Sequence, residues 1–284
     1  IIQQGDNMNL VYGNLNKLEV IKETDISYTL SNGIDTVFLH FNQTPKKLKI
    51  GEKVNAFLYF DQKKRLCATL EKPLITSTKP GFVKVVETND AGVFVNIGIA
   101  KDILVSKDFL PDNKSLWPNV DDEIPCIIKV KTNQLVAKPL STEDHFSKDL
   151  PNVKDKLNGT VTYINQNGIQ VCTSDFKVCF INKNLLRETY KVGQVIDFHI
   201  ISLKGNLMYG STTSNKELAR LSDSDQILTY LRNMGGSMPL GNLSTPEEIY
   251  KKTKLSKSAF KRAIGHLYKL KLITIEDYLI TLNE

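Results

Sequence analysis

Apolar and polar residues follow one another in a pattern that recurs about every seventy residues along most of the chain. In each copy, a turn that carries an acidic or amide side chain leads into an apolar strand, at Gly51-Glu52-Lys53-Val54, Asp121-Asp122-Glu123-Ile124 and Gly193-Gln194-Val195-Ile196. The starts of these turns lie 70 and 72 residues apart. Because a fixed spacing of this kind marks a structural repeat, the sequence predicts three copies of one small unit.

Each copy contains about five short segments with the residue pattern of β-strands. After the turn, two strands rich in β-branched and aromatic residues flank a polar hairpin turn, at residues 61–64, 131–134 and 203–206. An earlier pair of strands precedes it, for example residues 82–86 and 93–97. A lone hairpin cannot bury its apolar face, whereas five strands can close into a small barrel. The fold class expected is therefore mainly β with an α/β tail: three tandem five-stranded OB-like barrels followed by a winged-helix domain.

The segments between the repeats set the expected domain boundaries. Two stretches that contain proline, residues 72–80 and 141–155, are typical of linkers, and the second also has mixed charge. The expected domains are a first OB-like barrel at residues 1–72, a second at 78–140, a third and more divergent one at 151–213, and a winged-helix domain at 216–284.

After Ser214 the periodicity changes from strand-like to helical. Ile227, Leu228 and Leu231 recur at helical spacing, and Thr245-Pro246-Glu247-Glu248 is typical of a capping box that begins a second helix. Ser256 is placed to cap a third helix, whose apolar residues share one face. Two short apolar segments near the end of the chain predict a hairpin. Three helices and a terminal hairpin are the winged-helix arrangement, a relative of the helix-turn-helix.

Charge indicates a phosphate-rich partner. The 284 residues are 41% hydrophobic and 24% charged, which is the balance of a soluble globular protein. The net charge of +6 is unevenly placed, because residues 249–271 hold eight Lys or Arg and no Asp or Glu. Such a basic surface suits nucleic acid, and a merely solvated helix face is the alternative. The candidate contacts on the third helix are Lys257, Lys261, Arg262, His266 and Lys269.

The sequence holds no motif for catalysis or for a cofactor. It lacks a phosphate-binding loop, a dinucleotide glycine pattern, a His-Glu-x-x-His zinc motif and a Gly-x-Ser-x-Gly elbow. Its four cysteines are not spaced as zinc ligands and are expected to be buried reduced thiols. We therefore expect no catalytic residue, no metal, no cofactor and no small-molecule substrate. No apolar stretch is long enough to span a bilayer, so a cytoplasmic protein without a membrane partner is expected.

Two segments resemble a known protein family. The third helix, Ser258-Ala259-Phe260-Lys261-Arg262-Ala263-Ile264-Gly265-His266-Leu267-Tyr268-Lys269, closely resembles that of the conserved virulence factor B family of Gram-positive bacteria. Ser115-Leu116-Trp117-Pro118 is also similar to that family, and so is the order of the parts over essentially the whole chain. The resemblance implies three RNA-binding barrels of the ribosomal S1 type, a winged helix, and a regulator of virulence-factor expression in pathogens.

A barrel that binds single-stranded RNA needs exposed rings on which bases stack and cations that hold phosphates. On the binding face expected from the S1 alignment, the candidates are Phe38 and His40 in the first unit, Phe82 and Phe94 in the second, and Tyr163 and Phe180 in the third. A core position is the alternative for each of these rings, because aromatic side chains on strands are often buried.

The three units do not keep the family's aromatic-x-His element equally. The first unit keeps it at Phe38-Leu39-His40. The third unit has Asn182 in the place of the histidine, and Ile103-Leu104-Val105-Ser106 in the second unit lacks both residues. These differences argue against the same mode of RNA binding in all three barrels.

The function expected from these features is that of a single-stranded RNA-binding regulator of the bacterial cytoplasm. It would control gene expression after transcription and, by the resemblance, virulence-factor expression in pathogens. The chain is predicted not to be an enzyme. Two alternatives stay open: a DNA-binding transcription regulator that uses the winged helix, and a non-catalytic accessory subunit of a ribonuclease or ribosome-associated complex.

Overall fold

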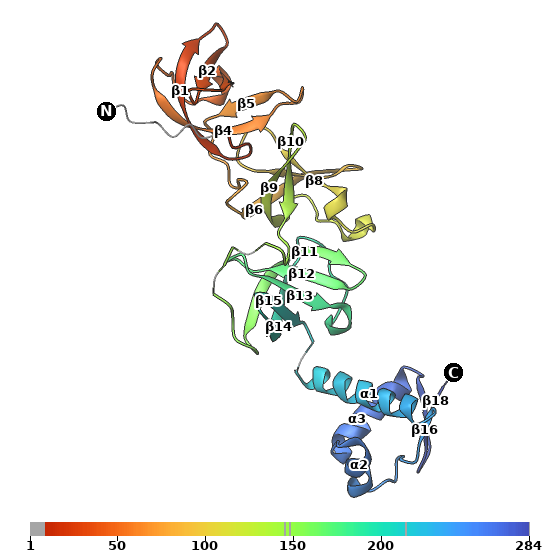
Figure 1. The fold of residues 1–284 in the computed structure, drawn as a ribbon. Coiled ribbons are helices and arrows are strands. Elements are labelled where there is room, and N and C mark those ends of the chain that lie inside the picture. Colours follow the sequence, from red (N-terminus) through yellow and green to blue (C-terminus); the bar gives the residue numbers. More distant parts are fainter. Residues whose placement is uncertain (1–8, 145, 148, 214, 284) are drawn as a thin grey trace. The chain divides into compact units, whose positions relative to one another are not determined.

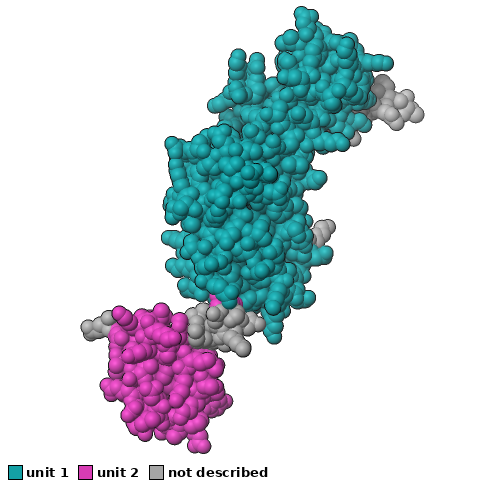
Figure 2. Space-filling model, turned by 180° about the vertical axis from the view of Figure 1, so that it is seen from behind, with its two compact units in different colours: residues 1–212 teal, residues 213–284 magenta. Residues whose placement is uncertain are grey.

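The computed structural model describes residues 9–144, 146–147, 149–213 and 215–283. The chain divides into two compact units, with the boundary between Thr212 and Thr213 (Figure 2). The first unit contains three β-barrels in chain order, and the second contains helices and a small sheet (Figure 1). Among the described residues, no helix is long and apolar enough to cross a membrane.

Each barrel is closed and has its five strands in the same order. The first barrel contains β1 (Leu15–Glu23), β2 (Ser27–Ser31), β3 (Thr36–His40), β4 (Lys53–Phe60) and β5 (Leu66–Thr69). The second contains β6 (Gly81–Asn89), β7 (Gly92–Asn96), β8 (Ile103–Ser106), β9 (Glu123–Lys131) and β10 (Gln134–Pro139). The third contains β11 (Lys156–Asn165), β12 (Gly168–Cys172), β13 (Val178–Asn182), β14 (Val195–Lys204) and β15 (Leu207–Ser211).

Strand pairing is also the same in the three barrels. The first strand pairs in antiparallel fashion with the second and the fourth, and the third strand runs parallel to the fifth. Short 3-10 turns follow the third strand, at η1 (Phe41–Gln43), η2 (Lys107–Phe109) and η4 (Lys183–Leu185), and the second barrel adds η3 (Lys114–Leu116). The predicted series of five-stranded OB-like barrels is confirmed.

The repeated turn makes the same hydrogen bonds in every barrel. Its acidic or amide side chain accepts a hydrogen bond from the backbone N–H three residues earlier: Glu52 from Lys49 at 3.1 Å, Asp122 from Asn119 at 2.7 Å and Gln194 from Lys191 at 3.2 Å. The residue before it has a left-handed backbone, with φ of 85° at Gly51, 75° at Asp121 and 85° at Gly193, and donates its N–H to the first strand. The turn therefore holds the fourth strand against the first and closes the barrel.

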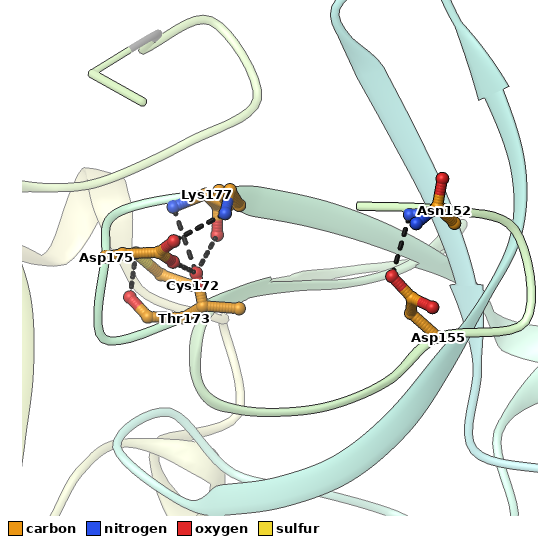
Figure 3. A network of polar contacts seen from close by, with 6 residues as sticks. All are labelled: Asn152, Asp155, Cys172, Thr173, Asp175 and Lys177. Atoms are coloured by element: carbon orange, nitrogen blue, oxygen red, sulfur yellow. Dashed lines mark hydrogen bonds and ion pairs between the residues drawn. The ribbon is translucent and has the colours of Figure 1, made fainter. Parts of the chain in front are cut away.

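A fourth turn of this kind precedes the third barrel (Figure 3). The N–H of Asn152 donates to Oδ2 of Asp155 at 2.8 Å, and Lys154 between them has a φ of 80°. In the same view, an ion pair of 2.5 Å between Lys177 and Asp175 stabilises the turn that joins β12 to β13. The turn at residues 152–155 thus shows that the same hydrogen-bonded turn can precede the first strand of a barrel as well as the fourth.

The segment at residues 72–80, expected as a linker, packs between the first two barrels. Ile75 is fully buried, and the N–H of Ile128 on β9 donates to the carbonyl of Thr76 at 3.1 Å. Gly13, before β1, approaches the second barrel so closely that an added Cβ would lie 2.6 Å from Cγ2 of Ile128. The first two barrels are consequently joined by a packed interface and not by a free tether.

The second and third barrels also touch. The rings of Phe82 on β6 and Phe176, from the turn after β12, have centroids 5.8 Å apart. Phe176 packs against a buried cluster that contains side chains of both barrels, namely Ile127, Leu140, Cys172 and Val178. The N–H of Val192 donates to the carbonyl of Leu116 at 2.9 Å, so backbone hydrogen bonding also crosses this junction.

The second unit has the predicted winged-helix fold. Its elements are α1 (Asn215–Asn233), β16 (Ser237–Met238), α2 (Pro246–Thr253), α3 (Lys257–Lys269), β17 (Ile273–Ile275) and β18 (Ile280–Leu282). The capping box is confirmed, because Thr245 and Glu248 accept hydrogen bonds from each other's backbone N–H groups, and Ser256 caps α3. The two-residue strand β16, which the sequence pattern does not reveal, pairs with β18 and makes the hairpin a three-stranded sheet.

The closing turn of the second barrel yields the first prediction. Asp122→Ala should lower the free energy of unfolding by about 1 kcal/mol, because the N–H of Asn119 then loses its acceptor. Asp122→Asn keeps an acceptor oxygen and should cost less. Urea denaturation followed by the fluorescence of Trp117, the chain's single tryptophan and a buried residue of the same barrel, measures both changes. Unchanged stability of Asp122→Ala would show that the turn does not depend on this hydrogen bond.

Candidate nucleic-acid interface

Four neighbouring strands of the third barrel bring a row of half-buried side chains together on the outer face. Tyr163 on β11 lies opposite Gln170 on β12, and Gln170 lies opposite Phe180 on β13. Phe180 lies beside Tyr209 on the parallel strand β15, and their rings meet edge to face with centroids 6.3 Å apart. Nζ of Lys204 lies 5.7 Å from the centroid of the Tyr209 ring. Tyr163, Gln170, Phe180 and Tyr209 are called the aromatic row below.

A β-bulge in the first strand of the third barrel, β11, turns the side chain of Tyr163 to the outer face, where it joins the aromatic row. The register shifts between Val161 and Tyr163, and Val161 is fully buried whereas Tyr163 is half-buried. An extra residue of this kind bends a strand and redirects its side chains. Bulges occur at the equivalent places in the other barrels, between Val20 and Lys22 in β1 and between Val85 and Glu87 in β6.

The equivalent rows of the other barrels carry fewer rings. In the first barrel the row consists of Lys22, Thr29, Phe38 and Cys67. In the second it consists of Glu87, Phe94, Leu104 and Val136. Phe38 is 60% exposed and Phe94 is half-buried. The third barrel therefore offers three rings for stacking, and each of the others offers one.

His40, Ser106 and Asn182 occupy one equivalent position. Each ends the third strand of its barrel and accepts a hydrogen bond from the backbone N–H two residues later, at 3.3, 3.3 and 3.0 Å respectively. Ser106 and Asn182 thus keep the capping contact of the histidine that they replace. The barrels differ in the outward residue two positions earlier, which is Phe38, Leu104 or Phe180.

Phe82 lies outside these rows, in the junction with Phe176. Elsewhere between the second and third barrels, a groove of about 950 Å³ is lined by the turn after β11 and by the η2–η3 segment of the second barrel. Tyr163 is one of its walls, and Lys107 and Lys114 are cations on the other side. Trp117 is buried, and its Nε1 donates to the carbonyl of Pro111 at 2.7 Å, which gives this ring a packing role.

Helix α3 presents one apolar and one cationic face. Phe260, Ala263, Ile264 and Leu267 are buried in the core of the second unit. Lys261, Arg262 and Lys269 are exposed, as is Tyr268, whereas Lys257 and His266 are half-buried. Among the described residues, none of the ion pairs includes Lys261, Arg262 or Lys269. These three cations are therefore exposed and unpaired within the part of the chain whose side chains the structure describes.

Gly265 lies in the middle of α3 and has no packing reason to be a glycine. A Cβ added there would meet no atom within 4 Å. A glycine inside a helix costs roughly 0.5–1 kcal/mol relative to alanine. Beside Lys261, Arg262 and Tyr268, this position therefore places no side chain over the helix backbone.

The cysteines are placed for packing and not for reaction. Cys126, Cys172 and Cys179 are buried, as expected, whereas Cys67 is half-buried. Burial raises the pKa of the Cys172 and Cys179 thiols to about 12, so that the reactive thiolate is suppressed near neutral pH. Within the described residues, no group of His, Cys, Asp and Glu side chains is arranged to hold a metal ion.

Three closed five-stranded barrels followed by a winged helix define a multidomain protein of tandem S1-like and winged-helix domains. A model of the S1 domain matches residues 12–71, one described as the CvfB first S1-like domain matches residues 81–137, and one described as the CvfB-like winged helix domain matches residues 225–282. A protein named conserved virulence factor B from Staphylococcus saprophyticus is 30% identical over 96% of this chain and 95% of its own length. The chain belongs to the conserved virulence factor B family.

Two further relatives match most of the chain. A protein named uncharacterized protein YitL from Bacillus subtilis is 35% identical over 89% of this chain and 87% of its own length. A solved structure from Streptococcus pneumoniae, described as a multidomain protein with nucleic acid binding domains, is 26% identical, covers 96% of this chain and 98% of its own, and superposes with a TM-score of 0.52. Both comparisons extend over barrels and winged helix alike.

Proposed function

We propose that the protein binds single-stranded RNA without acting on it chemically, and that it regulates gene expression after transcription in the bacterial cytoplasm. The aromatic row of the third barrel is the observation that carries this proposal. Three rings and the Lys204 ammonium lie together on one outer face. Flat bases stack on such rings whatever their identity, at roughly 1–3 kcal/mol per base, while cations hold the phosphates.

The winged helix supplies a second contact with the strand. Lys261, Arg262 and Lys269 on α3 are exposed, and Gly265 leaves room for a sugar-phosphate backbone beside them. Linking weak modules raises the effective concentration of each for a strand held by another. The names of the staphylococcal relatives support a role in virulence, and the description of the streptococcal structure supports a nucleic acid partner.

A rival function follows from the same helix. In helix-turn-helix proteins the equivalent helix enters the major groove of duplex DNA, so a DNA-binding transcription regulator is the second candidate. An accessory role for a ribonuclease or ribosome would use this helix as a protein contact. The aromatic row favours RNA, because stacking needs unpaired bases that a duplex does not offer.

Competition between nucleic acids tests the function. The full chain should bind a labelled single-stranded RNA of about 12 nucleotides, a length within the range that one OB fold covers, and duplex DNA of equal length should displace it poorly at physiological salt. Fluorescence anisotropy with unlabelled competitors measures the order of affinities. Tighter binding of the duplex would favour the transcription regulator, and no binding of either would overturn the proposal.

The aromatic row can be tested ring by ring. Phe180→Leu removes a stacking surface but keeps an apolar side chain, so the dissociation constant for single-stranded RNA should rise about tenfold. Phe82→Leu is the matched control, because the Phe82 ring packs on Phe176. Binding isotherms of both variants give the comparison, and an equal loss in the two would mean that the row does not stack bases.

Helix α3 is tested through salt dependence. Lys261→Glu with Arg262→Glu should weaken RNA binding and flatten the slope of log affinity against log salt by about 1.4, since each phosphate contact on a single strand contributes about 0.7. Lys17→Glu with Lys53→Glu, in the first barrel, changes the net charge equally and should leave the slope nearly unchanged. The wild-type slope in the α3 variant would show that this helix does not meet the backbone.

A further inference from the structure

The first and second barrels share one hydrophobic core. Phe57 and Phe60 of β4 are buried in the same cluster as Val95 and Val105 of the second barrel. At the edge of this interface, Nζ of Lys101 donates to the carbonyl of Phe60 at 2.6 Å. Because close-packed interiors deform little, a site that the two barrels build together is already formed before any ligand arrives.

Such a site lies where the β4–β5 turn of the first barrel meets the outer face of the second. A hollow of about 210 Å³ opens there. The first barrel lines it with Gln62 and Lys64, and the second with Phe94 of its outward row, Asn133 and Gln134. Its volume suits a small ring system and not a peptide or a folded partner.

Two of the charged groups that line this hollow, Asp61 and Lys101, have partners, whereas Lys64 and Asp102 take part in none of the described ion pairs. The carboxylate of Asp61 forms an ion pair with Arg65 at 2.6 Å and accepts the backbone N–H groups of Lys63 and Arg65 at 2.8 and 2.9 Å. The ammonium of Lys101 is bound to the Phe60 carbonyl, and burial lowers the pKa of Lys101. The lining therefore combines one ring and neutral amides, which both donate and accept hydrogen bonds, with the carboxylate of Asp102, whose pKa is raised by burial and by the charge of Glu87.

We propose that this hollow binds one nucleobase of a single-stranded RNA, which stacks on Phe94 and forms hydrogen bonds through its edge with the amides of Gln62 and Gln134. The inference rests on the proposed function and deepens it, because it assigns the choice among RNA bases to this hollow. Stacking on a ring accepts every base, whereas paired amide contacts to a base edge discriminate among bases. Lys64 supplies a cation for the adjoining phosphate.

The hollow exists only because the barrels are joined. Gln62 belongs to the first barrel, and Phe94 and Gln134 belong to the second, so neither barrel alone has both walls. In the aromatic row of the third barrel, Tyr163 borders the groove shared with the second barrel, whereas the stacked rings of Phe180 and Tyr209 belong to the third barrel alone and would hold bases without selecting them. The protein would thus combine one selective contact with several unselective ones.

Affinities for the four RNA homopolymers test this proposal. Fluorescence anisotropy of the full chain with labelled 12-mers of rA, rU, rC and rG should show that the wild type prefers one of them. Gln62→Ala and Gln134→Ala should each reduce the affinity for that homopolymer about tenfold and leave the other three within about twofold. The double variant should lose less than the product of the single losses, because one base bridges the two side chains.

Thr132→Ala, in the β9–β10 turn two residues before Gln134, is the matched control, and the exposed position of all three side chains keeps the fold intact. A wild type that binds the four homopolymers equally, or single variants that keep the wild-type preference, would overturn the base-binding hollow while leaving RNA binding in place. Absence of binding to every homopolymer would instead refute the proposed function, and the hollow with it.

Discussion

Closure of a five-stranded barrel is the constraint on which the rest of the structure depends. Side chains alternate along a strand, and in a barrel this small one set fills the interior completely. Val161, Ile169 and Ile181 are such residues in the third barrel, and the other set faces outward. Closure requires the fourth strand to return to the first, and the turns at Glu52, Asp122 and Gln194 direct it there. The outer face is then free to diverge, because nothing in the interior depends on it.

That freedom explains why three barrels of one design differ as binding surfaces. Each has the bulge in its first strand and the cap at the end of its third, so the backbone that displays the outward row is the same. Only the side chains of the outward row change. The first barrel has the exposed Phe38, the second has Phe94 beside Leu104, and the third has the aromatic row. The loss of the family's histidine in two barrels is structurally mild, because Ser106 and Asn182 make the same capping hydrogen bond.

The sequence predicted what local interactions determine. The repeated turn and the capping box at Thr245 are hydrogen-bonded within three residues, and the apolar face of α3 follows from helical spacing. It missed what distant segments bring together. Tyr209 joins Phe180 only through parallel pairing of β13 with β15, which no short motif encodes, although the alternation of β15 already marks Tyr209 as outward-facing. The packing of Phe82 on Phe176 and the burial of Ile75 likewise depend on contacts between barrels. The local sequence around Phe82 and Ile75 therefore could not predict them.

Packing between barrels changes what tandem binding can achieve. Barrels on free tethers would lose conformational freedom each time a strand aligned them, and that loss would offset part of the gain from linkage. The shared core around Phe57 and Phe60 removes this cost for the first two barrels, and the Phe82–Phe176 contact extends the argument to the third. Rigid placement also limits which strand conformations fit, since contacts at fixed spacing reject a strand that must bend to reach them. If the protein binds RNA as proposed, modest stacking energies in each barrel can therefore give both affinity and selectivity without a strong contact at any single residue.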